Sequence, residues 1–243
     1  MAYQLSFKPY GEHAILVEWP KLISEDILKD VLRFKTNIEY SDVANVSEVR
    51  SAYNSLLLVY SHFKRGFQDE VDLLKKIYNS NTISSASKPK LWKIPVCYDS
   101  HFGIDLEAIS ETKKLSVIDI IKFHSEAIYT VYFIGFLPGF LYLGGLDDRI
   151  MMPRKSTPRL KIEQGTVAIG GNQTGVYPSA SPGGWNIIGN SPINFFNINK
   201  EEPCFAKAGD QIQFYPITLK EHTDIKTLVD AQVYQLESEV VDG

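Results

Sequence analysis

The chain of 243 residues is 44% hydrophobic and 22% charged, which is enough to form one large buried core or two smaller ones. Its net charge of -4, without a Lys/Arg-rich block, argues against nucleic-acid and anionic-membrane partners. The two cysteines, Cys97 and Cys204, lack metal-ligand spacing, and the first residues lack an export-signal pattern, so we expect a cytoplasmic protein without a structural metal.

The first part of the sequence predicts a small α+β unit. One amphipathic helix is expected after Ser24, a predicted N-cap followed by Glu25 and Asp26 in the first turn. A second helix is expected from Phe67 to Tyr78, where apolar residues recur at helical spacing. The predicted order is strand, helix, strand, strand, helix, strand, a split β-α-β arrangement with strands at residues 13–19, 43–50, 55–61 and 91–98.

Residues 79–89 are mostly small and polar, which is typical of an exposed loop or of an interdomain linker. The pattern is compatible with both. We place the boundary between two domains, residues 1–90 and 91–243, within the window 79–98. Residues 79–89 are the expected first site of limited proteolysis, because they cannot bury enough surface to offset the entropy of ordering.

Residues 127–146 are uncharged over the length of a membrane span, but their pattern predicts strands instead. Aromatic and β-branched side chains dominate the first half, and Leu137, Pro138 and Gly139 interrupt the run. We therefore expect two buried strands that are separated at this Pro-Gly pair.

The second part of the chain predicts a barrel or a sandwich. A helix is expected after Ser116, with Val117, Ile121, His124 and Ile128 on one face. Short apolar runs separated by Gly, Pro and Asn then predict further strands at residues 165–171, 185–189, 193–198 and 211–217.

Several motifs in this part occur in a characteristic order: PGF-x-YL (138–143), PR-x-x-x-PR (153–159), QTG-x-YP (173–178) and SPGGW (181–185). With these motifs, the chain resembles the KipI family, also called allophanate hydrolase subunit 1, most densely over residues 94–216. The resemblance implies a ferredoxin-like N-terminal domain followed by a cyclophilin-like β-barrel with a C-terminal extension. The sequence departs from the family at Asn190, where relatives usually carry Arg.

The resemblance also implies work within a complex. Some family members act with two further components, A and C, to hydrolyse 5-oxoproline to glutamate with ATP, and this is the activity that we expect. Alternatives are an inhibitor of a sporulation histidine kinase and a carboxyltransferase-type subunit that acts on urea-derived substrates. The segment 171–175 lacks the Lys-Ser/Thr of a phosphate-binding loop, so ATP is expected to act through the complex, and the chain alone is expected to be inactive.

Arg154 and Arg159 are the strongest candidates for anion binding, since each follows a proline and guanidinium groups suit carboxylate or phosphate. On a straight strand they would point to opposite faces, so they can meet one anion only if the chain bends at residues 156–158. From the residues alone, it is also open that both arginines form solvated ion pairs on the surface. The resemblance favours the anion site.

His124 has a pKa suited to general-base catalysis, but its place on an apolar helix face favours a core histidine that is bonded to the backbone. Ser181 lacks the flanking glycines of a nucleophile elbow, which argues against covalent catalysis. The PGF motif adds Pro138, Gly139 and Phe140 as further candidates from the resemblance.

The stretch 171–192 has no charged residue or histidine but is rich in Gly and Pro. Its backbone N–H groups and polar side chains could orient a small polar ligand, or the same residues could make tight turns and pack against a partner subunit. The candidate ligand-binding residues in this stretch are Gln173, Thr174, Tyr177, Ser181, Gly183, Gly184 and Trp185.

Overall fold

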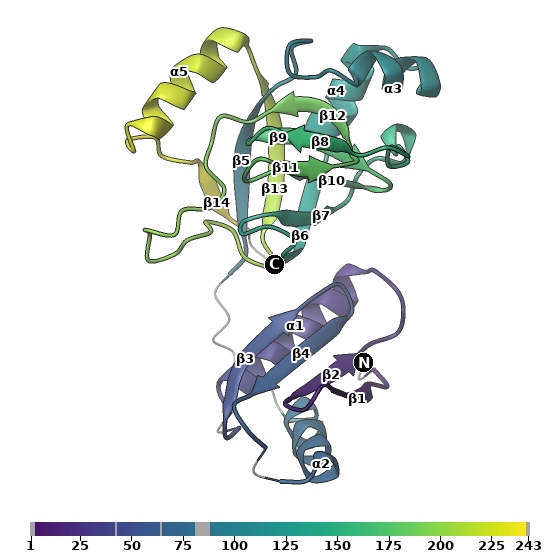
Figure 1. Cartoon of the computed structure of the whole chain (residues 1–243), viewed down its shortest axis with the longest axis vertical. Helices are drawn as coiled ribbons and strands as arrows, with labels where there is room; N and C mark the ends of the chain where they lie inside the picture. The colour runs from purple at the N-terminus through teal and green to yellow at the C-terminus, as the bar shows by residue number, and fades with distance from the viewer. Residues whose placement is uncertain (1–2, 42, 64, 81–87, 242–243) are drawn as a thin grey trace. The chain divides into compact units, whose positions relative to one another are not determined.

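Two large β-sheets carry most of the fold, and each encloses or covers its own hydrophobic core. The computed structural model describes residues 3–41, 43–63, 65–80 and 88–241. It divides the chain into two units, residues 1–87 and 88–243 (Figure 1). Most of the predicted linker, residues 81–87, lies outside the described part of the chain.

The first unit is an antiparallel sheet in the order β1-β2-β4-β3 with two helices. Its elements are β1 (Ser6–Tyr10), β2 (Ala14–Glu18), α1 (Glu25–Glu39), β3 (Val46–Ser51), β4 (Ser55–Tyr60) and α2 (Phe67–Tyr78). Helix α1 begins where the sequence predicts, because the Ser24 side chain accepts a hydrogen bond from the Ile27 N–H. Phe34, Leu56 and Leu74 are fully buried between the sheet and the helices.

One strand of the predicted split arrangement was assigned to the wrong unit. Residues 91–98, predicted as its last strand, lie in β5 (Lys90–Cys97) of the second unit. The place beside β2 is taken by β1, which was not predicted because four of its five residues are exposed and give no apolar alternation. In contrast, β5 is buried along most of its length and needs a neighbour on each side.

A closed seven-stranded barrel forms the second unit, in the order β12-β9-β10-β7-β6-β13-β5, and a β12–β5 pairing closes it. The strands β5 and β13 are parallel, whereas the other neighbours in the barrel are antiparallel. The further barrel strands are β6 (Ile128–Ile134), β7 (Leu141–Gly144), β9 (Thr166–Gly170), β10 (Gln173–Val176), β12 (Asn186–Asn190) and β13 (Gln211–Ile217).

Smaller elements surround the barrel (Figure 1). A separate two-stranded ribbon pairs β8 (Arg159–Ile162) with β11 (Ser181–Gly183), and β14 (Ser238–Val240) extends the sheet beside β5. The helices of this unit are α3 (Leu106–Lys113), α4 (Val117–Glu126), the short 3-10 helix η1 (Asp148–Ile150) and α5 (Leu219–Asp230).

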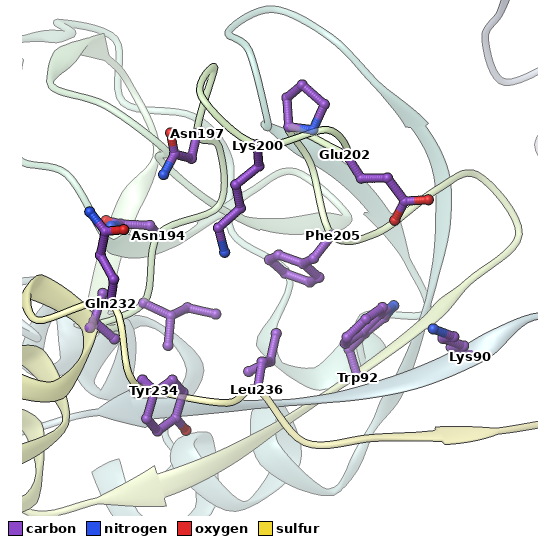
Figure 2. Close-up of a pocket in the computed structure, with 13 residues that line it drawn as sticks. Lys90, Trp92, Asn194, Asn197, Lys200, Glu202, Phe205, Gln232, Tyr234 and Leu236 are labelled. Atoms are coloured by element: carbon purple, nitrogen blue, oxygen red, sulfur yellow. The ribbon is translucent and has the colours of Figure 1, made fainter.

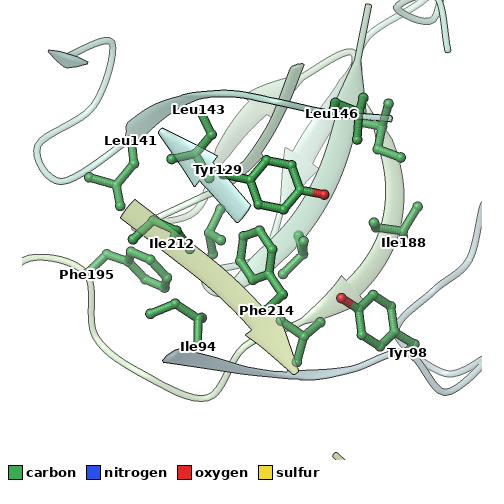
Figure 3. Close-up of a cluster of buried hydrophobic side chains, with 14 of the residues drawn as sticks. Ile94, Tyr98, Tyr129, Leu141, Leu143, Leu146, Ile188, Phe195, Ile212 and Phe214 are labelled. Atoms are coloured by element: carbon green, nitrogen blue, oxygen red, sulfur yellow. The ribbon is translucent and has the colours of Figure 1, made fainter. Parts of the chain in front are cut away.

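The barrel interior is filled by side chains from its strands. Figure 3 shows Ile94, Tyr129, Leu143, Ile212 and Phe214 pointing toward one another, and each is at most 1% exposed. Residues that alternate inward along each strand therefore leave a packed core and no channel.

Most strand predictions for this unit are confirmed, since β9, β12 and β13 lie at the predicted residues 165–171, 185–189 and 211–217. Ile128, predicted on the face of the helix after Ser116, instead opens β6, because α4 ends at Glu126. Strands β6 and β7 separate around Pro138 and Gly139, and the Ser116 side chain caps α4. The segment 193–198 is not a strand. Its Ile193 and Phe195 enter the barrel core from a loop, so their alternation reflects burial without strand pairing. The family names ferredoxin-like and cyclophilin-like remain predictions.

Candidate functional site

An aromatic cluster on the second unit brings together several of the predicted site residues. Phe140 lies edge-on to Tyr177 and to Trp185, with both ring centroids 5.7 Å away. These three rings are 2 to 5% exposed and pack with Ile162, Ala168 and Ile187. We call these six residues the aromatic cluster. Because Ile162 comes from β8, and Ala168 and Ile187 from β9 and β12, the ribbon and the barrel wall both contribute to it.

Glycines in the uncharged stretch allow these rings to lie close to the strands. A Cβ on Gly170 would lie 2.5 Å from the Trp185 ring, and a Cβ on Gly183 would lie 2.4 Å from the Tyr177 hydroxyl. Neither position can carry a side chain without displacing the ring beside it. The glycine content of this stretch is thus explained in part by aromatic packing.

Arg154 and Arg159 both lie near this cluster. The guanidinium carbon of Arg154 lies 5.5 Å from the centre of the Trp185 ring, a cation–π geometry. Burial raises the pKa of Tyr177, while the positive charges of Arg154 and Arg159 oppose that rise. The chain bends at residues 156–157, so the two arginines flank the cluster despite their odd spacing.

Asp105 holds two cations at the edge of this cluster. Its Oδ1 lies 2.8 Å from Nη2 of Arg159 and 2.9 Å from Nζ of Lys155. Its Oδ2 accepts a hydrogen bond of 2.7 Å from the Ile187 N–H. Burial favours the neutral acid, but Arg159, Ile187 and Lys155 together hold the pKa of Asp105 below its ordinary value. The ion pair between Asp105 and Arg159 is partly buried, so it differs from a solvated surface ion pair.

The other terminal nitrogen of Arg159, Nη1, is buried and has no hydrogen-bond partner within the described residues. A buried donor without a partner costs about 1–3 kcal/mol, so it favours any ligand that supplies an acceptor. Arg154 likewise has no carboxylate partner among the residues that the structure describes. The site thus combines an aromatic wall with a buried guanidinium donor of Arg159 that has no partner, and with an Arg154 side chain that has no carboxylate partner, among the described residues.

Asp105 and Lys155 were not predicted from the sequence. Asp105 stands directly before α3, where an acidic residue normally caps the helix. Its side chain makes no capping hydrogen bond and is used by Arg159, Lys155 and Ile187 instead. Lys155 follows Arg154 directly, so a third cation within the PR-x-x-x-PR motif, besides the two arginines, was the available signal.

Other predicted site residues lie apart from this cluster or use their polar groups elsewhere. The Thr174 hydroxyl is fully buried and donates to the Ala168 carbonyl. The Ser181 hydroxyl donates to the carbonyl of its neighbour Pro182, and the Gly184 carbonyl accepts from the Lys155 N–H.

Three more predicted residues are placed by the fold alone. Gln173 opens β10, and Pro138 is exposed in the loop between β6 and β7. Gly139 has a positive φ of 83° and packs against Phe195 and Phe196, where a Cβ would lie 2.7 Å from that of Phe196.

His124 is enclosed in the barrel core. Its Nδ1 lies 2.7 Å from the Tyr98 hydroxyl and its Nε2 lies 2.8 Å from the Thr174 hydroxyl. The Thr174 hydroxyl donates its proton to the Ala168 carbonyl, so it must accept from the Nε2–H of His124. The Nδ1 atom of His124 then accepts from the Tyr98 hydroxyl. Burial lowers the pKa of His124 to about 3. The histidine is neutral and bonds two side-chain hydroxyls rather than the backbone partner that the sequence suggested.

A separate cavity of about 420 Å³ opens near the start of β5 (Figure 2). None of the predicted site residues lines it. Among the described residues, no group of three or more His, Cys, Asp or Glu side chains could hold a metal ion. In the same part of the chain, no helix is long and apolar enough to span a membrane.

Comparisons with known proteins relate the chain to carboxyltransferases and oxoprolinases. Residues 5–206 match the family model described as carboxyltransferase domain, subdomain C and D. The chain is 33% identical over 232 residues to the B component of the 5-oxoprolinase of Bacillus subtilis, covering 91% of this chain and 97% of the relative.

Two solved structures have a similar fold. TTHA0988 is 28% identical with a TM-score of 0.73, and the match covers 84% of this chain and 40% of that one. The Kluyveromyces lactis urea carboxylase matches 98% of this chain and 24% of its own with a TM-score of 0.80, but at 19% identity it shows the fold alone.

Proposed function

Since this chain belongs to the family of carboxyltransferase domains, subdomains C and D, we propose that it is the B component of an ATP-dependent 5-oxoprolinase that converts 5-oxo-L-proline to L-glutamate. The similarity to the Bacillus subtilis protein covers nearly the whole of both chains and supports this assignment. The proposed complex is cytoplasmic and contains further subunits similar to the A and C components of 5-oxoprolinase.

We place the site at Arg159 because of the partners of its two terminal nitrogens. One of its terminal nitrogens holds Asp105, and the other is buried without a partner among the described residues. Opening the lactam ring requires transfer of a phosphoryl group from ATP to its amide oxygen, addition of water to that carbon, and cleavage of the ring C–N bond with a proton passing to the nitrogen. A second water then releases phosphate from the resulting acyl phosphate and leaves the new carboxylate. Each species carries a carboxylate or a phosphate, and guanidinium donors suit both.

The surrounding residues would strengthen such an interaction. The Trp185 ring covers one side of the Arg154 guanidinium, and Nη1 of Arg159 is buried, and charge attraction is stronger where water is excluded. Asp105 fixes the orientation of Arg159 and Lys155 before a ligand binds. We propose that Arg159 and Arg154 bind the anionic groups of the substrate or of its phosphorylated form.

The residues that the structure describes do not supply the other groups that the reaction needs. The described residues show no catalytic pair of nucleophile and base at the aromatic cluster, because His124 is sealed in the barrel core. We therefore propose that ATP and the attacking water are handled with the A and C components, and that the chain alone is inactive.

The test is glutamate release from 5-oxoproline and ATP by the purified chain, with and without the A and C components. Turnover is expected only from the complete complex. Turnover by the chain alone would contradict the proposal that ATP and the attacking water are handled with the A and C components. A complex that assembles, as seen by size-exclusion chromatography, yet never releases glutamate would contradict the activity itself.

The family model supports one alternative, a carboxyltransferase-type subunit that acts on urea-derived substrates. This alternative predicts transfer of a carboxyl group from carboxybiotin in a reconstituted complex, without use of 5-oxoproline. The histidine-kinase inhibitor remains a prediction from the resemblance, and a kinase autophosphorylation assay with the purified chain tests it.

A further inference from the structure

The cavity near the start of β5 lies apart from the aromatic cluster and shares no residue with it. Three segments distant in sequence enclose it: the first residues of β5, the loop 193–205, and the residues from the end of α5 to Leu236. Its volume of about 420 Å³ falls in the range of small-molecule sites. The proposed function leaves this cavity without a role.

The floor of the cavity is apolar and partly aromatic. The Trp92 and Phe205 rings meet edge-on with centroids 5.0 Å apart, and the buried side chains of Ile193 and Val229 complete the floor. The Trp92 indole N–H is already used, because it donates to Asp210 Oδ2 at 2.9 Å. The floor therefore offers flat apolar contact and no free donor of its own.

The polar groups of the wall favour an anion. Figure 2 shows Lys200 reaching from its loop toward the middle of the cavity, and its ammonium has no ion-pair partner within the described residues. Lys90 adds a second positive charge, although its Nζ lies 5.1 Å from the centre of the Trp92 ring, and Glu202 is the one acid among the described lining residues. Three carboxamides add N–H donors: Asn194, Asn197 and Gln232.

One wall residue is held in a conformation that its residue type disfavours. Gln232 follows α5 with a φ of 60°, in the left-handed region where glycine is usual after a helix. The left-handed turn after α5 directs the carboxamide of Gln232 to the cavity wall, where a ligand would meet it.

We propose that this cavity binds a small organic carboxylate with a flat or apolar body. The carboxylate is bound by Lys200 and the neighbouring carboxamides, while the body lies on Trp92 and Phe205. The apolar floor favours an organic carboxylate over inorganic phosphate, because only a ligand with an apolar body can bury surface against Trp92 and Phe205. This inference is independent of the proposed function.

The three tryptophans of the chain allow a direct test. Trp19 lies in the core of the first unit, Trp185 in the aromatic cluster and Trp92 in the cavity floor. Each contributes one indole N–H signal to a two-dimensional NMR spectrum of the nitrogen-15-labelled chain, and Trp→Phe variants assign the three signals. Benzoate is the probe, and benzamide is its neutral counterpart.

Benzoate is expected to move the Trp92 signal with saturation and to leave Trp19 and Trp185 in place. Benzamide and inorganic phosphate are expected to bind at least about tenfold more weakly, because benzamide lacks the negative charge and phosphate lacks the apolar ring. A Trp92 signal that stays fixed up to about 20 mM benzoate, or moves equally with benzamide, would overturn the proposal.

Two substitutions of the wall should act in opposite directions. Lys200→Gln is expected to raise the Kd for benzoate about tenfold, and Glu202→Gln to lower it about twofold to fivefold. Lys122→Gln, on the exposed face of α4, is the matched control and should leave the Kd unchanged. Equal affinities in all three variants would contradict a charge-based site.

Gln232→Gly separates binding from folding. Glycine relieves the left-handed conformation, so the melting temperature should stay the same or rise, while loss of the carboxamide raises the Kd for benzoate. An unchanged Kd in this variant would remove Gln232 from the site.

A second titration uses 5-oxo-L-proline. A shift of Trp92 alone would show that the cavity binds carboxylates and that the substrate site of the proposed function is misplaced. A shift of Trp185 alone, with benzoate moving Trp92, supports both proposals.

Discussion

The carboxylate of Asp105 lies 2.8 Å from the guanidinium of Arg159, although 54 positions separate them in the sequence. Lys155 shares the same carboxylate oxygen, and the Ile187 N–H occupies the other one. The orientation of the arginine therefore depends on α3, β8 and β12 together.

Arg159→Ala and Arg154→Ala are expected to reduce turnover by the complete complex. Loss of a charge-assisted pair in a partly desolvated site should cost roughly 2 to 4 kcal/mol of transition-state stabilisation, or ~30- to 1000-fold in rate. Arg159→Lys should rescue poorly, because lysine keeps the charge but loses the planar fork. The measurement is steady-state glutamate release, with assembly checked by size-exclusion chromatography.

Arg149→Ala is the matched control for these variants, since Arg149 pairs with Asp147 on the surface and lies outside the aromatic cluster. It should keep turnover near the wild-type rate. Wild-type rates in both Arg154→Ala and Arg159→Ala would contradict the proposal that these arginines bind the substrate anion.

Asp105→Asn should destabilise the fold in a pH-dependent way. The folded pKa of Asp105 lies below its ordinary value of 3.8, so its ion pairs stabilise the protein above pH 3.8 and stop doing so as the pH falls through the folded pKa. We expect a loss of about 1–3 kcal/mol in the free energy of unfolding at pH 7, which shrinks below about pH 4. Urea denaturation at several pH values measures it.

For comparison, Asp224→Asn removes an exposed carboxylate that pairs with Lys220 along α5. It should change the free energy of unfolding by less than about 0.5 kcal/mol at any of these pH values. An Asp105→Asn profile parallel to that of Asp224→Asn would show that the Asp105 pairs contribute nothing.

His124→Phe should change how stability depends on pH. The unfolded histidine gains a proton below pH 6.5, whereas the folded one stays neutral down to about pH 3, so acid favours unfolding of the wild type. This histidine contributes a slope of about 1.4 kcal/mol per pH unit between these limits, and the phenylalanine variant should lack it.

At pH 7 the same variant should be less stable by about 1–3 kcal/mol, because the Tyr98 hydroxyl loses its acceptor inside the core. Adding Tyr98→Phe should recover part of this loss. Identical pH profiles for wild type and His124→Phe would mean that the histidine is reached by protons in the folded state.

Gly183→Ala should destabilise the second unit, since its Cβ would lie 2.4 Å from the Tyr177 hydroxyl and 2.5 Å from the Ile162 side chain. Overpacking of this kind costs about 1–3 kcal/mol. Gly135→Ala is the control, because its Cβ would meet nothing closer than 3.5 Å and its φ is not positive. Tyr177→Phe should soften the effect of Gly183→Ala, and thermal unfolding of the single and double variants tests this coupling.

The sequence was sufficient where local chemistry decides the structure. Ser24 and Ser116 cap their helices as predicted, and the Pro138-Gly139 pair separates two strands. Helix α5 was missed, although Thr218 and Glu221 form a capping box that was readable in the sequence. The strand predicted at 193–198 failed because two alternating buried side chains do not reveal whether the backbone is paired.

The site could be predicted only in part, because its contacts join distant segments. The two arginines were found from their motif. No local sequence pattern predicts the contact of Asp105 with Arg159, because the two residues are 54 positions apart. The cavity at Trp92 is built from three segments, none of which carries a motif of its own. Such sites depend on tertiary contacts that a single sequence does not display.

The pairing of β5 with β13 has a consequence for synthesis of the chain. The Lys90 N–H donates to Asp210 from 120 positions away, and β5 pairs in parallel with β13 from Leu91 to Cys97. Every strand pair of the first unit, in contrast, lies within residues 6–60 and is available early in translation. On the ribosome, β5 must wait for β13 until about 120 further residues have been made, so the second unit has the higher contact order and the longer exposure to aggregation and chaperones.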